Sequence, residues 1–266
     1  MTRLLMVGAG HMGGAMLRRW LAAGLSPAEV TVVSPNGRPM PDGVRVLRAI
    51  PDVCEGDYDL ILLALKPQQL ASLRDGPLAG HRPRLLVSIL AGVEVATLAP
   101  LCPAATVVRA MPNLPVAIGA GVVALHAADA GTAARDEVAA LMAPLGLVEW
   151  IADEAQFDDV TALAGCGPAF LFRFADALAA AGASLGLPQD QAARLALATI
   201  RGAAEMAAQA DVGPAVLADR VASPGGSTRQ GLDVLDRADG LAPLLRETLA
   251  AAAARNREMA AAARRA

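Results

Sequence analysis

A glycine-rich turn between an apolar strand and a helix is the feature near the N-terminus that most restricts the fold. It has the form G-x-G-x-x-G, follows the apolar run Arg3–Val7 and opens a helix. Glycines in this pattern permit a tight turn and let backbone N–H groups approach a pyrophosphate, while the helix N-terminus carries partial positive charge. An ordinary tight turn is the alternative. In this context the pattern predicts dinucleotide binding by Gly8, Ala9, Gly10, His11, Met12 and Gly13.

Strand-like and helical segments alternate through the first 150 residues. The expected strands are Arg3–Val7, Val30–Val33, Tyr58–Leu65, Arg84–Leu90, Thr106–Ala110, Gly121–Leu125 and Leu147–Trp150. The expected helices are Gly13–Ala23, Gln68–Leu73, Glu94–Ala99 and Thr132–Ala143. The early strands are short continuous apolar runs, as expected of strands buried on both faces. Their alternation with helices predicts βαβ units and a mostly parallel sheet.

The pattern changes at about Glu154, where strand-like runs give way to alanine-rich helical segments. These are Glu154–Leu163, Ala169–Gly186, Pro188–Ala210, Pro214–Val221, Thr228–Ala238 and Leu241–Ala263. Several are apolar around much of their circumference, which indicates burial, here against another chain. The sequence therefore predicts an α/β Rossmann domain over residues 1–153, followed by an all-α substrate-binding and dimerisation domain over residues 154–266.

Composition argues against several other classes of protein. A formal net charge of −3 gives no electrostatic footprint for nucleic acid. The apolar stretches are interrupted by proline, glycine or charge, and the N-terminus lacks a signal-peptide cleavage site, so we expect no membrane partner. Cys54, Cys102 and Cys166 are odd in number and form no CxxC pair, which argues against a disulfide framework and a zinc site. We expect a cytoplasmic protein with no metal.

The end of the second strand indicates which dinucleotide binds. An acidic residue there normally holds the ribose 2′-hydroxyl of NAD, but this strand ends in Ser34-Pro35-Asn36-Gly37-Arg38. Ser34, Asn36 and Arg38 can instead hydrogen-bond and neutralise a 2′-phosphate, unless the segment is only a polar turn. We expect NADPH, with NADH possible.

Two further strand ends are candidate cofactor contacts. Lys66, the only lysine in the chain, precedes Pro67 directly after Tyr58–Leu65. Ligands of open parallel sheets bind at this carboxyl edge, although a solvated turn residue is the alternative. Ala91 and Gly92 close the strand Arg84–Leu90 and could let backbone pack against the nicotinamide.

Two glycine-containing segments in the helical half are candidate anion sites. Gly165-Cys166-Gly167-Pro168 and Ser223-Pro224-Gly225-Gly226-Ser227-Thr228 each end at a helix start, where free N–H groups suit a carboxylate. Simple capping by Ser227 or Thr228 is the alternative. Beyond His126 the chain has no His, Lys or Tyr, the usual acids of carbonyl reductases. That absence favours reduction of C=N over C=O, since a protonated imine needs no strong enzyme acid.

Taken in order, these segments resemble the pyrroline-5-carboxylate reductase family. The matching residues are Gly8–Gly13, Ser34-Pro35, Ala64–Gln68, Ser88–Val93, Arg109–Pro115, Thr161–Phe170 and Val221–Thr228. The Ser-Pro-Gly-Gly segment is the most specific of these, because the glycine loop occurs in many families. Small departures from the family pattern are His11, Cys166 and Ser227, while Ile50-Pro51 stands where an asparagine often touches the cofactor.

The resemblance implies a fold, a reaction and site residues. It implies a helical domain that interlocks with a partner chain as a homodimer, in some members as a decamer. Ala64, Leu65, Lys66 and Pro67, with Ala91 and Gly92, would line the inner half of NADPH. Gly225, Gly226, Ser227 and Thr228 would hold the carboxylate of 1-pyrroline-5-carboxylate through backbone N–H groups.

In the same resemblance, the Thr228 hydroxyl would act on the ring nitrogen while hydride reduces the imine to L-proline. The alternatives are another imine reductase, a β-hydroxyacid dehydrogenase of the same architecture, or a non-enzymatic NADP-binding protein. Hydroxyacid dehydrogenases of this type usually carry a lysine in the helical domain, and this chain has none there.

Overall fold

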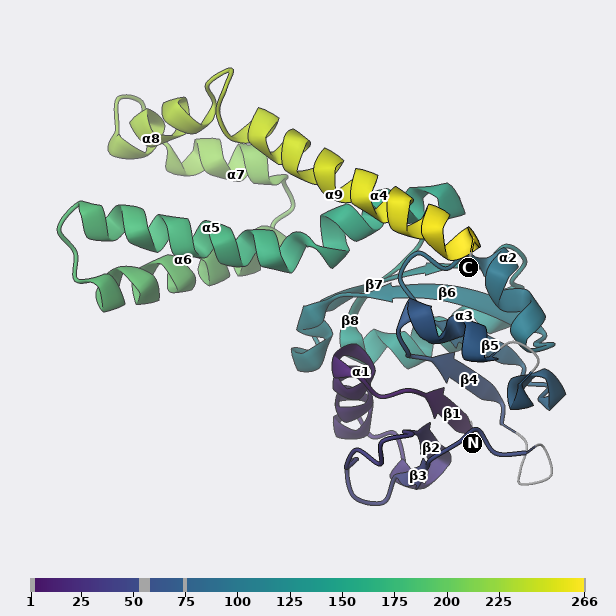
Figure 1. Cartoon of the computed structure of the whole chain (residues 1–266). Coiled ribbons are helices and arrows are strands. Elements are labelled where there is room, and N and C mark those ends of the chain that lie inside the picture. Colours follow the sequence, from purple (N-terminus) through teal and green to yellow (C-terminus); the bar gives the residue numbers. More distant parts are fainter. Residues whose placement is uncertain (1–2, 53–57, 74–75, 266) are drawn as a thin grey trace. The chain divides into compact units, whose positions relative to one another are not determined.

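The computed structural model describes residues 3–52, 58–73 and 76–265, so Cys54 lies outside the described residues. It divides into two compact units (Figure 1). The first contains Met1–Cys166 together with Ala252–Ala266, and the second contains Gly167–Ala251. The domain boundary expected after residue 153 stays a prediction.

The first unit is built on one sheet of eight strands within the described residues. The strands are β1 (Leu4–Val7), β2 (Val30–Val33), β3 (Arg45–Leu47), β4 (Leu60–Leu63), β5 (Leu85–Ser88), β6 (Thr106–Pro112), β7 (Gly121–His126) and β8 (Gly146–Trp150). Their order is β3-β2-β1-β4-β5-β6-β7-β8, and every pair is parallel except β6 with β7. The order reverses between β1 and β4, which is where ligands bind in sheets of this type. The expected parallel α/β fold is confirmed.

Helices cover both faces of this sheet. They are α1 (His11–Ala22), α2 (Val95–Leu98), α3 (Thr132–Met142) and α4 (Phe157–Val160), the 3-10 segments η1 (Pro27–Glu29), η3 (Pro67–Leu73), η4 (Pro77–Gly80), η5 (Ala99–Leu101), η6 (Leu114–Ile118), η7 (Ala143–Leu145) and η8 (Glu154–Gln156), and the π-helical turn η9 (Thr161–Gly165). Leu4 and Met6 pack with α1 and α3 on one face, whereas Leu5 and Val7 pack with η3, η4 and α2 on the other. Burial on both faces explains why the central strands are uninterrupted apolar runs.

The second unit is helical. It contains α5 (Gly167–Ser184), α6 (Gln189–Gln209), α7 (Pro214–Val221), α8 (Ser227–Leu235) and the first part of α9 (Leu241–Arg265). The helices α5 and α6 are antiparallel neighbours, and a Cβ on Gly182 would lie 3.4 Å from the Cβ of Ala192. Small side chains therefore let these two helices approach closely. The expected succession of an α/β unit and helices is confirmed.

Three local features differ from the sequence expectation. The strand β3 was not predicted, because two of its three residues are exposed and its pattern is not apolar. The expected helix Gln68–Leu73 is a 3-10 segment, Pro67–Leu73. The expected helix Glu154–Leu163 is a succession of 3-10, α and π turns, in which the amide of Asn113 donates to the carbonyl of Ala164 at 2.9 Å.

Candidate functional site

The glycines of the loop after β1 have three separate structural roles. Gly8 has φ +91°, and a Cβ there would lie 2.7 Å from the carbonyl oxygen of Ala64 at the end of β4. A Cβ on Gly13 would lie 2.6 Å from the Met6 side chain, so this glycine lets α1 pack closely on β1. A Cβ on Gly10 would meet nothing within 4 Å. The loop is thus tight at its first glycine, packed at its third and open at its second, as a pyrophosphate cradle requires.

The segment after β2 forms a turn that brings an arginine to the same loop. The Gly37 N–H donates to the Ser34 carbonyl at 2.9 Å, and the buried Ser34 hydroxyl accepts from the Arg38 N–H at 3.2 Å. The Arg38 guanidinium then donates to the Ala9 carbonyl at 3.4 Å. Residues 34–38 can therefore form a polar turn and still contact the cofactor. Asn36 is exposed within the turn.

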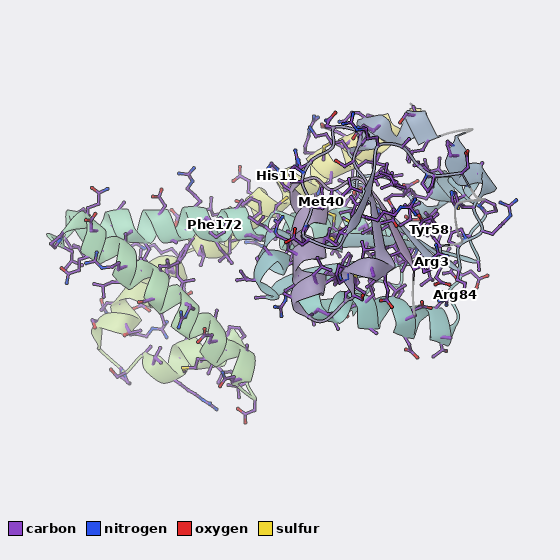
Figure 2. The ribbon with its side chains drawn as sticks, turned by 90° about the horizontal axis from the view of Figure 1, so that it is seen from below. Arg3, His11, Met40, Tyr58, Arg84 and Phe172 are labelled. Carbon is purple, nitrogen blue, oxygen red and sulfur yellow. The ribbon has the colours of Figure 1, made fainter. Side chains whose placement is uncertain are left out.

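These two segments border one pocket. Its lining residues are Ala9, Gly10, His11, Gly14, Leu17, Arg18, Arg38, Pro39, Met40 and Pro41. Figure 2 shows His11 and Met40 next to each other at this place. The sequence reasoning identified Ala9, Gly10, His11 and Arg38 but missed Arg18. Arg18 follows His11 by seven residues on α1, a spacing that puts both on one face of a helix and could have revealed it.

The strand ends after β4 and β5 are at the same carboxyl edge of the sheet. Ala64 touches Gly8 as described, and Lys66 is exposed with its N–H donating to the Gln69 side chain at 3.1 Å. Gly92 has φ +72°, and a Cβ there would lie 3.3 Å from the backbone of Ala260 in α9. Close approach of α9 is therefore one reason for a glycine at this position. The expected nicotinamide contact of Ala91 and Gly92 stays a prediction.

The candidate substrate segment lies in the second unit, at the start of α8. Gly225 has φ +72°, and the Gly226 N–H donates to the Ser223 carbonyl at 2.9 Å, which makes a turn. Gly226 is the N-cap of α8 and no side chain caps this helix, so the alternative interpretation, capping by Ser227 or Thr228, is wrong. Both side chains are exposed. Their N–H groups are in the first helical turn and have no intrahelical acceptor, which leaves them available to an anion.

An arginine ties this helix start to the preceding helix. Arg229 pairs with Asp219 of α7 at 3.0 Å, with Asp233 at 3.2 Å and with Asp236 at 3.3 Å. The hydrogen bond that Arg229 donates to Asp219 and the charges of the three carboxylates raise the pKa of Arg229, so it stays cationic. An ion pair between α7 and α8 therefore joins the two helices on either side of the turn that contains Gly225.

Other polar groups of the first unit have structural roles. Arg109 is buried, pairs with Glu154 at 3.2 Å and stacks over the Phe157 ring at 4.4 Å. Burial raises the pKa of the Cys102 thiol to about 11, so it stays protonated and unreactive. Among the described residues, no group of three or more His, Cys, Asp and Glu side chains could hold a metal ion.

Two family models match the chain. The model described as pyrroline-5-carboxylate reductase dimerisation matches residues 154–259. The model described as NADP oxidoreductase coenzyme F420-dependent matches residues 3–92. The first covers the helical part of the chain and the second covers the glycine loop and the strands β1 to β5.

Full-length relatives give the same result. The chain is 35% identical over 265 residues to pyrroline-5-carboxylate reductase of Pseudomonas aeruginosa, covering 97% of each. It is 36% identical over 265 residues to that of Arabidopsis thaliana, covering 95% of this chain and 94% of the relative. A solved pyrroline-5-carboxylate reductase from Coxiella burnetii matches with a TM-score of 0.85 at 30% identity, covering 97% of this chain and 98% of that one. The Plasmodium falciparum pyrroline carboxylate reductase, solved with NADP bound, matches with a TM-score of 0.80 at 25% identity and the same coverage.

Proposed function

The chain belongs to the pyrroline-5-carboxylate reductase family, and we propose that it reduces 1-pyrroline-5-carboxylate to L-proline with NADPH. The observation that carries this proposal is the glycine loop after β1. Its open Gly10, between two glycines that the packing requires, fits a dinucleotide pyrophosphate. The NADP-bound relative and the NADP oxidoreductase model support NADPH as that dinucleotide, and when bound it supplies the hydride.

The cofactor would be held by four strand ends of the first unit. The N–H groups from Gly8 to Gly13 would bind the pyrophosphate, and Ser34, Asn36 and Arg38 would bind the adenosine end. Ala64, Leu65, Lys66 and Pro67, with Ala91 and Gly92, would line the nicotinamide half. The turn that holds Arg38 against the Ala9 carbonyl supports a preference for NADPH, because a guanidinium suits a 2′-phosphate. NADH stays a weaker possible cofactor.

The substrate would be held at the start of α8. Its carboxylate would accept from the N–H groups of Ser227 and Thr228, while Gly225 and Gly226 shape the turn before them. The Thr228 hydroxyl would hydrogen-bond the ring nitrogen. Hydride addition at C5 moves the C=N electron pair to that nitrogen, which already carries its proton. The residues then contribute orientation and electrostatic anchoring, and no side-chain acid is needed.

A cofactor-oxidation assay tests the reaction. Purified protein is mixed with NADPH and racemic pyrroline-5-carboxylate, and proline formation is measured beside the loss of reduced cofactor. The same assay with NADH and with the six-membered piperideine carboxylate measures selectivity. Turnover of neither imine, with tight NADPH binding, would instead favour a non-enzymatic NADP-binding protein.

The role of Thr228 has its own test. Thr228→Ala should lower kcat at least tenfold, because the hydroxyl acts on the ring nitrogen, and should leave NADPH affinity unchanged. Ser184→Ala removes another exposed hydroxyl of the second unit and serves as the matched control. Equal turnover in the Thr228 and control variants would remove Thr228 from the mechanism.

We also propose that the active form is a homodimer in the cytoplasm, without a nucleic-acid partner. The helix α5 has no buried residue within its unit, and Leu171, Phe172 and Phe174 are exposed. By length and composition, Glu154–Ser184 is apolar enough to cross a membrane. The match to a dimerisation model over residues 154–259 supports a partner chain, rather than lipid, as the cover for this apolar surface. Assembly of dimers into a decamer is possible within this proposal.

A further inference from the structure

The pocket beside the glycine loop is lined by basic groups from two directions. Arg18 and His11 come from α1, and Arg38 comes from the segment after β2. None of the pocket-lining residues is Asp or Glu. Within the described part of the chain, neither Arg18 nor Arg38 makes an ion pair with a carboxylate. Two guanidinium groups beside one pocket, with no acid between them, favour an anionic ligand.

The Arg18 side chain lies beside Gly14 on α1. A Cβ on Gly14 would be 3.4 Å from Nη1 of Arg18 and 3.7 Å from the carbonyl oxygen of Ala9. The Arg18 side chain therefore lies back along α1 toward its N-terminus, over the bare backbone of Gly14. This is the ordinary direction for a long side chain on a helix. The guanidinium of this exposed residue consequently lies beside Gly14, in the lining of the pocket.

Arg38 reaches the same place from the other side of the pocket. Its Nη1 donates to the Ala9 carbonyl at 3.4 Å, and Ala9 lines the pocket together with Arg18 and Arg38. The turn held by the Ser34 hydroxyl fixes the backbone of Arg38. Arg18 and Arg38 therefore line the same pocket, one from α1 and one from the segment after β2.

We propose that Arg18 is a second specificity-determining residue, which together with Arg38 binds the 2′-phosphate of NADPH. This inference rests on the proposed function, because it assigns one phosphate of the proposed cofactor. A phosphate dianion accepts charge-assisted hydrogen bonds from two guanidinium forks at once, whereas the 2′-hydroxyl of NADH offers neither charge nor the extra oxygens. Arg18 should therefore affect the binding of one cofactor and leave the other unchanged.

Direct binding of each cofactor to full-length Arg18→Gln tests this inference. The dissociation constant for NADPH should rise about 10- to 100-fold, the effect of losing a charged hydrogen-bonding partner, and that for NADH should change less than about twofold. Arg18→Lys should restore part of the NADPH affinity. Arg194→Gln removes the same charge from an exposed position in the second unit and should change neither constant.

The outcomes separate the inference from the proposed function. Unchanged NADPH affinity in Arg18→Gln, or an equal loss for NADPH and NADH, would overturn the role of Arg18 while the proposed reaction stands. A wild-type protein that binds neither dinucleotide would overturn the proposed function, and the assignment of Arg18 would fall with it. Thermal unfolding of each variant without cofactor shows whether folding is intact.

Discussion

At the scale of single residues, Gly8, Gly10 and Gly13 are each glycine for a different structural reason. Gly8→Ala would put a Cβ 2.7 Å from a backbone oxygen at φ +91°, whereas Gly10→Ala would meet nothing within 4 Å. We expect Gly8→Ala to lose about 2–4 kcal/mol of unfolding free energy through strain and overpacking. Gly10→Ala should lose less than about 1 kcal/mol, an N-cap effect, but should weaken NADPH binding at least tenfold. Denaturant unfolding measures the loss of stability, and cofactor titration measures the loss of NADPH affinity. Equal stability of the two variants would contradict a structural role for Gly8 that Gly10 does not share.

A titratable group gives a second prediction at this scale. Burial raises the pKa of Asp158 above its usual value, more than Arg109 and Arg257 lower it. The folded protein therefore holds this proton more tightly than the unfolded chain, so its contribution to stability falls as pH rises from about 4, the usual pKa of aspartate. Asp158→Asn should raise the melting temperature at neutral pH, with a gain that shrinks as pH falls toward 4. Thermal scans across this range check the sign, and the neighbouring Asp159→Asn, which loses an ion pair with Arg257, should not show the gain.

At the scale of secondary-structure elements, Arg229 controls the start of α8 through its pairs with Asp219, Asp233 and Asp236. Arg229→Ala would leave three carboxylates near one another without their cation, and α8 would lose its tie to α7. We expect KM for the imine to rise severalfold while NADPH affinity is unchanged, because only the proposed carboxylate anchor would be disturbed. Arg201→Ala, which breaks the exposed pair with Glu205 on α6, is the control. A change in cofactor affinity, or an unchanged KM for the imine, would contradict a role confined to the substrate segment.

Elements also show what the sequence can predict and where it cannot. The strands β1, β2, β4 and β5 were predictable because burial on both faces demands an unbroken apolar run. β3 escaped because an exposed edge strand of Arg45-Val46-Leu47 carries no such run. The π-helical turn Thr161–Gly165 was also unpredictable, because it depends on Asn113, a partner 51 residues from Ala164 in the chain. The glycine loop was predicted from its own spacing, whereas the place of Arg18 in the pocket lining depends on how α1 lies against the segment after β2.

At the scale of the whole molecule, the exposed apolar residues of α5 predict that a partner chain covers this helix. Phe172 is 61% exposed on this helix (Figure 2), and a single large apolar patch normally marks an interface. Phe172→Asp would bury an unpaired charge in that interface, so we expect the dimer dissociation constant to rise by at least about 100-fold. Ile118→Asp changes an apolar residue of the first unit that is 77% exposed, and it should leave the dimer intact.

Sedimentation equilibrium of the wild type and both variants measures this effect. The N–H groups of α8 that we propose as the carboxylate anchor belong to the same helical unit as α5. Dissociation should therefore also lower imine reduction more than NADPH binding, which we assign to the first unit. Reassociation at high protein concentration should then restore activity. A wild type that is monomeric and fully active would contradict the dimer, and a Phe172→Asp dimer of unchanged affinity would move the interface away from this face of α5.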